Sequence, residues 1–230
     1  MSRYRIKKII INSYLNPIYL AKKYLCRGIK KIDDYPNGIL LDVGCGLKPY
    51  KNLFTNVNRY IGIELPTTLS QSKVVDIFAD TLNLPFKNCS FDTILCTEVL
   101  EHIREPKNLF SEAARVLRAN GILILSAPQV WGIHEEPHDY YRYTKYGLRY
   151  LAGYFGFEVI DISPTCGFWG VVGQRISSNI YNFYGKNKPF IFKALVLIPC
   201  CIIQIIFDFL NYLQGDVGDT LDNILVAYKK

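Results

Sequence analysis

Acidic residues are missing from the first 32 positions of this 230-residue chain, and no apolar run reaches twenty residues. Nine lysines and arginines precede Asp33, and the other eighteen stand against all twenty acidic residues, so the rest of the chain carries a net charge of −2. The basic excess therefore belongs to an N-terminal arm and not to the body of the protein. Because a membrane-crossing helix needs about twenty predominantly apolar residues, a simple single crossing is not expected.

Internal repeats, low-complexity tracts and a recognisable signal peptide are also missing. The run Ile9 to Ile11 is too short for the apolar region of a signal peptide, and no small-residue cleavage site follows it. The seven cysteines are an odd number scattered among apolar segments, a usage typical of core thiols in a reducing compartment. We therefore expect a cytoplasmic protein of one domain with extensions.

The most informative stretch reads DVGCGLKPY, from Asp42 to Tyr50. It follows the short apolar run 38–41, which predicts a buried strand of a parallel sheet. Gly44 and Gly46 let the backbone turn sharply and let a ligand approach the bare main chain. Open α/β sheets bind nucleotide-like ligands at such a turn, although a tight turn without a ligand is the alternative.

Two carboxylates follow the next two predicted strands. Residues 59–64 form a strand pattern that ends in Glu64, about twenty residues beyond the glycines, where nucleotide-binding βαβ units hold a ribose diol. Residues 74–77 predict the third strand, and Asp80 follows it just before Leu84-Pro85-Phe86.

With these motifs the chain resembles the class I S-adenosylmethionine-dependent methyltransferases of the methyltransferase type 11-like family. That family's pattern runs DxGCG, xDxxxLPF, SFDxxxxxEVLEH and RVLxxxGxLxLSxP, and the matching residues here are 42–46, 80–86, 90–102 and 115–128. The resemblance implies an α/β fold with a Rossmann-like seven-stranded sheet, mostly parallel with an antiparallel last strand, and helices on both faces. It implies S-adenosylmethionine as cofactor. The resemblance further implies that Asp42, Gly44 and Gly46 contact the methionine part of the cofactor. It implies that Glu64 binds the ribose and Asp80 the adenine amino group.

One position departs from the family's pattern. Lys48 stands where a third glycine is common, which also counts against a nicotinamide-dinucleotide site. We expect its ammonium group to be solvated, with the cofactor carboxylate as the alternative partner.

Alternating strand and helix patterns continue beyond the third strand, as an α/β fold requires. We expect strands at 91–96, 122–126, 157–163 and 223–228. Between them we expect a helix at 108–119 that ends at Asn120-Gly121, and a helix at 144–155 capped by Thr144.

Two segments extend the methyltransferase domain, which we expect over residues 35–230. Residues 1–34 predict a basic amphipathic arm that lies on an anionic membrane or covers the sheet with its apolar stripe, two roles that are compatible if different faces serve them. Residues 168–220 predict an apolar insertion between strands six and seven, with no charge from 194 to 207. Its length and Pro199 favour an interfacial or re-entrant helix, with a lid or a dimer interface as alternatives.

The acceptor side is expected after strands four and five. Glu98, Glu101 and His102 would share one face if EVLEH were helical. The stretch is similar to the ExxEH of the metal-assisted branch of the superfamily, which implies Mg²⁺ or Mn²⁺ held by these three residues and a later histidine, His138 or His134. Without a metal, His138 or His134 is the predicted general base. In other family members EVLEH only orders the loop.

These observations lead us to expect an S-adenosylmethionine-dependent enzyme that O-methylates a sugar or a polyprenyl-linked glycan at the cytoplasmic face of a membrane, to which it is peripherally attached. A quinone or other lipid-ring methyltransferase and a cofactor-binding but inactive partner protein are the alternatives. We expect no nucleic-acid partner, because no RNA-binding module is apparent and the basic arm is interleaved with isoleucines as in a membrane helix.

Overall fold

The computed structural model describes residues 13–66, 74–185 and 189–230. Its contacts divide the chain into two units. The sheet unit comprises Gly28–Ser163 and Asp222–Lys230, and the helical unit comprises Met1–Arg27 and Pro164–Leu221. The arm and the insertion, expected as separate extensions, thus contribute to the same unit.

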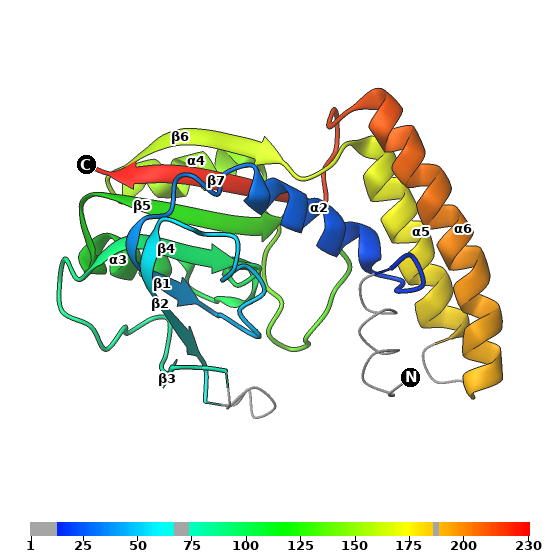
Figure 1. Ribbon diagram of the computed structural model, residues 1–230, viewed down its shortest axis with the longest axis horizontal. Coiled ribbons are helices and arrows are strands. Elements are labelled where there is room, and N and C mark those ends of the chain that lie inside the picture. Colours follow the sequence, from blue (N-terminus) through cyan, green and yellow to red (C-terminus); the bar gives the residue numbers. More distant parts are fainter. Residues whose placement is uncertain (1–12, 67–73, 186–188) are drawn as a thin grey trace. The chain divides into compact units, whose positions relative to one another are not determined.

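A seven-stranded sheet with the order β3-β2-β1-β4-β5-β7-β6 builds the sheet unit (Figure 1). Its strands are β1 (Gly38–Val43), β2 (Val57–Glu64), β3 (Ile77–Phe78), β4 (Phe91–Thr97), β5 (Leu117–Pro128), β6 (Phe157–Pro164) and β7 (Asp222–Lys229). Strand β1 pairs in parallel with β2 and β4, β2 with β3, and β4 with β5. Strand β7 runs antiparallel to β5. The expected mostly parallel sheet with an antiparallel last strand is therefore confirmed.

The parallel register brings the ends of four strands to one edge of the sheet. Asp42 in β1 lies opposite Gly62 in β2 and Leu95 in β4, and Glu64 at the end of β2 lies opposite Phe78 in β3. The glycine turn after β1, the carboxylate of Glu64 and the segments after β3 and β4 therefore meet at the carboxyl edge, where open α/β sheets bind ligands.

Central strands are almost continuously apolar, as expected when both faces of a parallel sheet are covered. Leu40 and Leu41 in β1 and Leu95 and Cys96 in β4 are fully buried. Burying one leucine side chain contributes roughly 1.5–3 kcal/mol, so these short runs hold the carboxyl edge in place.

Helices α3 (Pro106–Val116) and α4 (Lys145–Tyr154) contact each other, and they contact β5 and β7 respectively. The Thr144 hydroxyl accepts a hydrogen bond from the Gly147 N–H at 3.2 Å, which confirms the predicted cap of α4. The predicted end of α3 at Asn120-Gly121 is wrong. The helix ends at Val116, because Leu117 is extended, fully buried and paired with Phe91 as the first residue of β5.

The helical unit contains α5 (Phe168–Tyr184), α6 (Phe190–Gln214) and most of α2 (Tyr19–Lys30). On the predicted apolar stripe of α2, Leu25 and Ile29 are buried, as is Ile32 just beyond the helix. This part of the stripe therefore lies inside the protein, whereas Ile18, just before the helix, is 38% exposed, and contact of the arm with a membrane stays a prediction. The rest of the predicted arm, residues 1–12, lies outside the described residues.

Candidate functional site

The glycine turn after β1 depends on both backbone conformation and packing. Gly44 and Gly46 have φ values of 71° and 47°, in the left-handed region that favours glycine. The Gly44 N–H donates to the carbonyl of Ile63 at 3.0 Å, which ties the turn to β2. A Cβ atom at Gly44 would lie 2.3 Å from Cγ2 of Val99, so no other side chain fits there without a shift.

Two carboxylates stand beside this turn at the ends of neighbouring strands. Glu64 accepts hydrogen bonds from the N–H groups of Gly46 and Leu65, both at 3.1 Å, so its carboxylate lies against the glycine turn. Asp80 is exposed, and one of its oxygens accepts from the Leu82 N–H at 2.8 Å. Two ordered acceptors at the ends of β2 and β3 fit a nucleoside such as that of S-adenosylmethionine, whose diol and amino group supply donors. Their individual contacts remain predictions.

The buried carboxyl group of Asp42 forms a hydrogen bond with another side chain. Its side chain is 2% exposed and accepts a hydrogen bond from the Tyr60 hydroxyl at 2.5 Å. Burial raises the pKa of Asp42 to about 7, against the opposing effects of the Tyr60 hydrogen bond and of the Lys48 charge. That Asp42 orients the methionine part of the cofactor stays a prediction.

The expected solvation of Lys48 is wrong. Its side chain is only 6% exposed, and its ammonium nitrogen lies 2.5 Å from Oδ2 of Asp76. The same carboxylate oxygen accepts from the Gly62 N–H at 2.7 Å, so Asp76 fixes the lysine to the edge of β2. The hydrogen bonds to the ammonium group and to Gly62 lower the pKa of Asp76 although partial burial opposes them.

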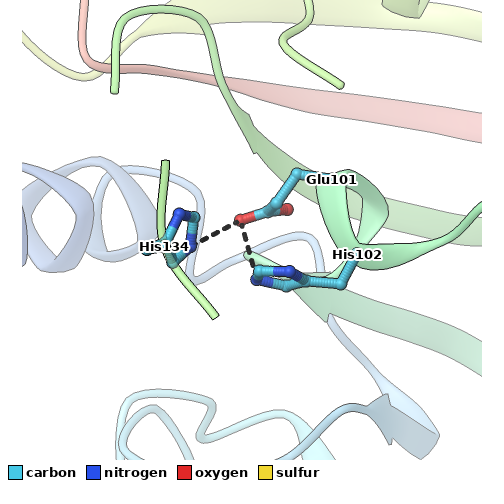
Figure 2. Close-up of side chains that lie close together, drawn as sticks. All are labelled: Glu101, His102 and His134. Carbon is cyan, nitrogen blue, oxygen red and sulfur yellow. Dashed lines mark ion pairs between the residues drawn. The ribbon is translucent and has the colours of Figure 1, made fainter. Parts of the chain in front are cut away.

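A second cluster of polar side chains follows β4 and β5 in the same unit (Figure 2). Glu101 and His102 come from η2 (Leu100–His102), the short 3₁₀ helix after β4, and His134 comes from the loop after β5. One ligand atom from each of the three residues lies within 4.8 Å of the others. Oε1 of Glu101 is 3.7 Å from Nε2 of His102 and 4.0 Å from Nε2 of His134.

Both imidazole rings are held through their other nitrogen. Nδ1 of His102 lies 2.6 Å from the backbone carbonyl oxygen of His138, and Nδ1 of His134 lies 3.2 Å from Oδ2 of Asp139. The guanidinium group of Arg142 in turn donates hydrogen bonds of 2.6 and 2.8 Å to the two carboxylate oxygens of Asp139. Metal-binding histidines are usually oriented in this way, with Nδ1 engaged and Nε2 turned to the ion.

Glu101 is the most deeply buried member of the cluster. Its side chain is fully buried, and neither carboxylate oxygen has a hydrogen-bond partner among the described residues. Burial first and the neighbouring Glu98 second raise the pKa of Glu101 to about 9. A buried carboxyl group that faces two imidazole nitrogens can bind a proton or a cation.

The structure brings together a different set from the predicted metal ligands Glu98, Glu101, His102 and His138. Glu98 has a φ of 53° and precedes η2, so the predicted shared helix face does not form. Its carboxylate accepts from the Ser126 hydroxyl at 2.6 Å, and burial raises its pKa. The imidazole of His138 is exposed, with Nδ1 3.2 Å from the Tyr140 hydroxyl oxygen.

His134, predicted as the alternative, occupies the place beside Glu101 expected for His138. Sequence reasoning missed the anchoring pair of Asp139 and Arg142. Their i, i+3 spacing and opposite charge, directly after the two candidate histidines, are the signal that points to them.

Comparison with known proteins agrees with this geometry. Residues 41–125 match the methyltransferase domain family. An uncharacterized methyltransferase of Mycolicibacterium paratuberculosis is 34% identical over 149 residues, which cover 56% of this chain and 58% of that protein. The chain spans about half the length of the curated relatives that it matches.

Two solved structures share the fold. The S-adenosylmethionine-dependent methyltransferase of Archaeoglobus fulgidus aligns with a TM-score of 0.59 at 12% identity, over 90% of this chain and 94% of that one. The Haemonchus contortus phosphoethanolamine N-methyltransferase 2 in complex with S-adenosyl-L-methionine aligns with a TM-score of 0.58 at 17% identity, over 89% and 52%.

The sheet order and the carboxyl-edge site define a Rossmann-like methyltransferase fold. The match of residues 41–125 to the methyltransferase domain family and the fold together support a class I S-adenosylmethionine-dependent methyltransferase.

Proposed function

We propose that this chain transfers the methyl group of S-adenosylmethionine to a hydroxyl oxygen of a sugar or of a polyprenyl-linked glycan. The observation that carries the proposal is the buried Glu101 carboxyl group facing Nε2 of His102 and of His134. In the transfer, the acceptor oxygen bonds to the methyl carbon while the carbon–sulfur bond breaks and S-adenosylhomocysteine leaves. The hydroxyl proton must go to a base, and the imidazole nitrogens beside Glu101 are the candidates for that role.

We extend the proposal to a divalent cation, Mg²⁺ or Mn²⁺, held by Glu101, His102 and His134. Three observations support it: the ligand atoms lie within 4.8 Å of one another, both rings are anchored through Nδ1, and the buried carboxylate has no hydrogen-bond partner among the described residues. A cation would stabilise the ionised carboxylate that burial otherwise disfavours. When bound, it would lower the pKa of a coordinated hydroxyl, which suits the vicinal diols of sugars. The proton would then pass to solvent water, because the ion occupies Nε2 of both imidazoles.

The acceptor can be tested by transfer of radiolabelled methyl from S-adenosylmethionine to a native cell extract that is then separated into membrane-lipid and aqueous fractions. The proposal predicts label in the lipid fraction that mild acid cleavage of a polyprenyl phosphate linkage releases, or label in a water-soluble sugar. Label in quinones would replace it with the lipid-ring alternative. Binding of S-adenosylhomocysteine without transfer to either fraction would favour the inactive partner.

The cation can be tested separately by Mn²⁺ titration of chelator-treated protein. We expect the wild type to bind one ion and His134→Ala to bind at least about tenfold more weakly, because a ligand is lost. Glu135→Gln is the matched control, since Glu135 lies 3.9 Å from Nε2 of His102 but its side chain is 74% exposed. Equal Mn²⁺ affinity of the wild type and His134→Ala would contradict this site.

A further inference from the structure

Helix α6 has its polarity reversed relative to a helix of a soluble protein. Its buried positions include Gln204 and Asn211, which are 0% and 2% exposed. Its exposed positions recur at steps of three and four and are between 48% and 81% exposed: Leu195, Ile198, Ile202, Ile205, Phe209 and Tyr212. A soluble helix buries its apolar stripe and exposes its polar one, so this exposed stripe is unusual.

The buried polar side chains form hydrogen bonds inside the helical unit. Oε1 of Gln204 accepts from the Leu20 N–H at 3.3 Å, and Oε1 of Gln174 in α5 accepts from the Ala21 N–H at 3.0 Å. Oδ1 of Asn211 accepts from the Gly167 N–H at 2.9 Å. These bonds attach the N-terminal part of α2 to the polar face of the α5–α6 pair. They therefore fix the apolar face of α6 outward.

Helices α5 and α6 form a hairpin whose two ends lie close together. Helices α5 and α6 lie side by side (Figure 1). The Phe168 N–H at the start of α5 donates to the carbonyl of Val217, just after α6, at 3.1 Å. With 25 residues, α6 is about 37 Å long. Within the described part of the chain it is the one helix long and apolar enough to cross a membrane, yet only 17% of its most apolar 18-residue window is buried.

Charge distinguishes the possible occupants of this face. The sequence of the helical unit includes eleven lysines and arginines against three aspartates, but six of these basic residues lie outside the described residues, and the described part has five against three, a net charge of +2. A second copy would carry the same net positive charge. An anionic lipid surface would attract it, by about 1 kcal/mol for each basic residue near the surface.

We propose that the exposed face of α6 inserts into the apolar boundary of an anionic lipid bilayer, with the polar face held against α5 and α2. Because the two ends of the hairpin meet, this insertion places both of them on one side of the bilayer. This inference goes beyond the proposed function, because it concerns how the chain is anchored and holds for any acceptor.

Flotation of the purified full-length protein with phosphatidylcholine vesicles, with and without phosphatidylglycerol, tests the proposal. We expect the wild type to float with the anionic vesicles, and Ile202→Ser/Ile205→Ser to float at least about tenfold less. Both positions are exposed, so the fold should survive, and near-ultraviolet circular dichroism checks it. Tyr150→Ser, at a side chain 66% exposed in the sheet unit, is the matched control and should float like the wild type.

Two outcomes would overturn the proposal. Undiminished flotation of the double variant would mean that charge alone attaches the protein. A wild type that stays with the aqueous phase and sediments as a dimer, which the double variant dissociates, would make the face an interface between two copies. The vesicles contain neither acceptor nor S-adenosylmethionine, so either result leaves the proposed methyl transfer to be judged by its own assay.

Discussion

Replacement of Glu101 by glutamine should stabilise the metal-free protein, by an amount that grows with pH. Burial raises the pKa of Glu101 to about 9, whereas a glutamate in the unfolded chain titrates near 4.5. Between these values the folded protein retains a proton that the unfolded chain has lost. The free energy of unfolding of the wild type therefore falls as pH rises, by up to about 1.4 kcal/mol for each pH unit.

Glutamine is neutral at every pH and nearly the same size, so Glu101→Gln removes this contribution. From pH 5.5 to pH 7.5 the stability difference in favour of the variant should grow by about 2–3 kcal/mol. The variant leaves unchanged the charged and titratable side chains around this carboxyl group: Glu98, His102, His134, Asp139 and Arg142. Urea denaturation in the presence of a chelator at several pH values measures the difference.

Glu135→Gln is the control for this experiment, because its carboxylate is near His102 but largely exposed, and it should keep the pH dependence of the wild type. Identical pH slopes for the wild type and Glu101→Gln would refute the inference that Glu101 is buried and protonated. A saturating divalent cation should reduce the difference between the two proteins, since it stabilises the ionised form of the wild type.

Three further predictions concern the cofactor, the base and the fold. Glu64→Ala and Asp80→Ala should each weaken S-adenosylmethionine binding by about 1–3 kcal/mol in calorimetric titrations, and unchanged affinity in both would disprove their assignment. His134→Ala should lower methyl transfer by at least about tenfold, whereas His138→Ala, which keeps the backbone carbonyl that orients His102, should lower it less; equal losses would contradict the observed arrangement. Thr144→Ala should lower the free energy of unfolding by about 1 kcal/mol through loss of the cap of α4, and urea midpoints unchanged within error would count against it.

Local patterns predicted most of the sheet and the cofactor edge. Short apolar runs marked the strands, and Gly44 and Gly46 marked the turn, because these features depend on residues adjacent in sequence. Parallel pairing then places the ends of β1, β2 and β3 at one edge, so Glu64 and Asp80 could be predicted to lie there from order alone.

Contacts between distant residues account for what the sequence did not predict. Lys48 is buried through an ion pair with Asp76, 28 positions away, which no local pattern indicates. Leu117 leaves α3 because its pairing with Phe91 outweighs the helical pattern.

On the acceptor side, the predicted grouping of Glu98 and His138 with Glu101 and His102 did not form, for a related reason. The left-handed conformation of Glu98 starts η2 later than a regular helix would, so Glu98 points to Ser126 while Glu101 turns inward. Which histidine meets Glu101 depends on the path of the loop after β5. That loop is held by a contact within it, between His134 and Asp139, and by a contact between distant residues, from His102 to the backbone carbonyl of His138.

The most direct test of the account is the chemical bond that the transferred methyl group forms. We would supply S-adenosylmethionine with a ¹³C-labelled methyl group, incubate it with the protein and a native extract, and record the carbon spectrum of the purified product. The account predicts a methyl carbon bonded to oxygen on a sugar, formed by the wild type and lost in His134→Ala. A methyl carbon bonded to nitrogen or to a ring carbon would contradict hydroxyl transfer at the Glu101, His102 and His134 site.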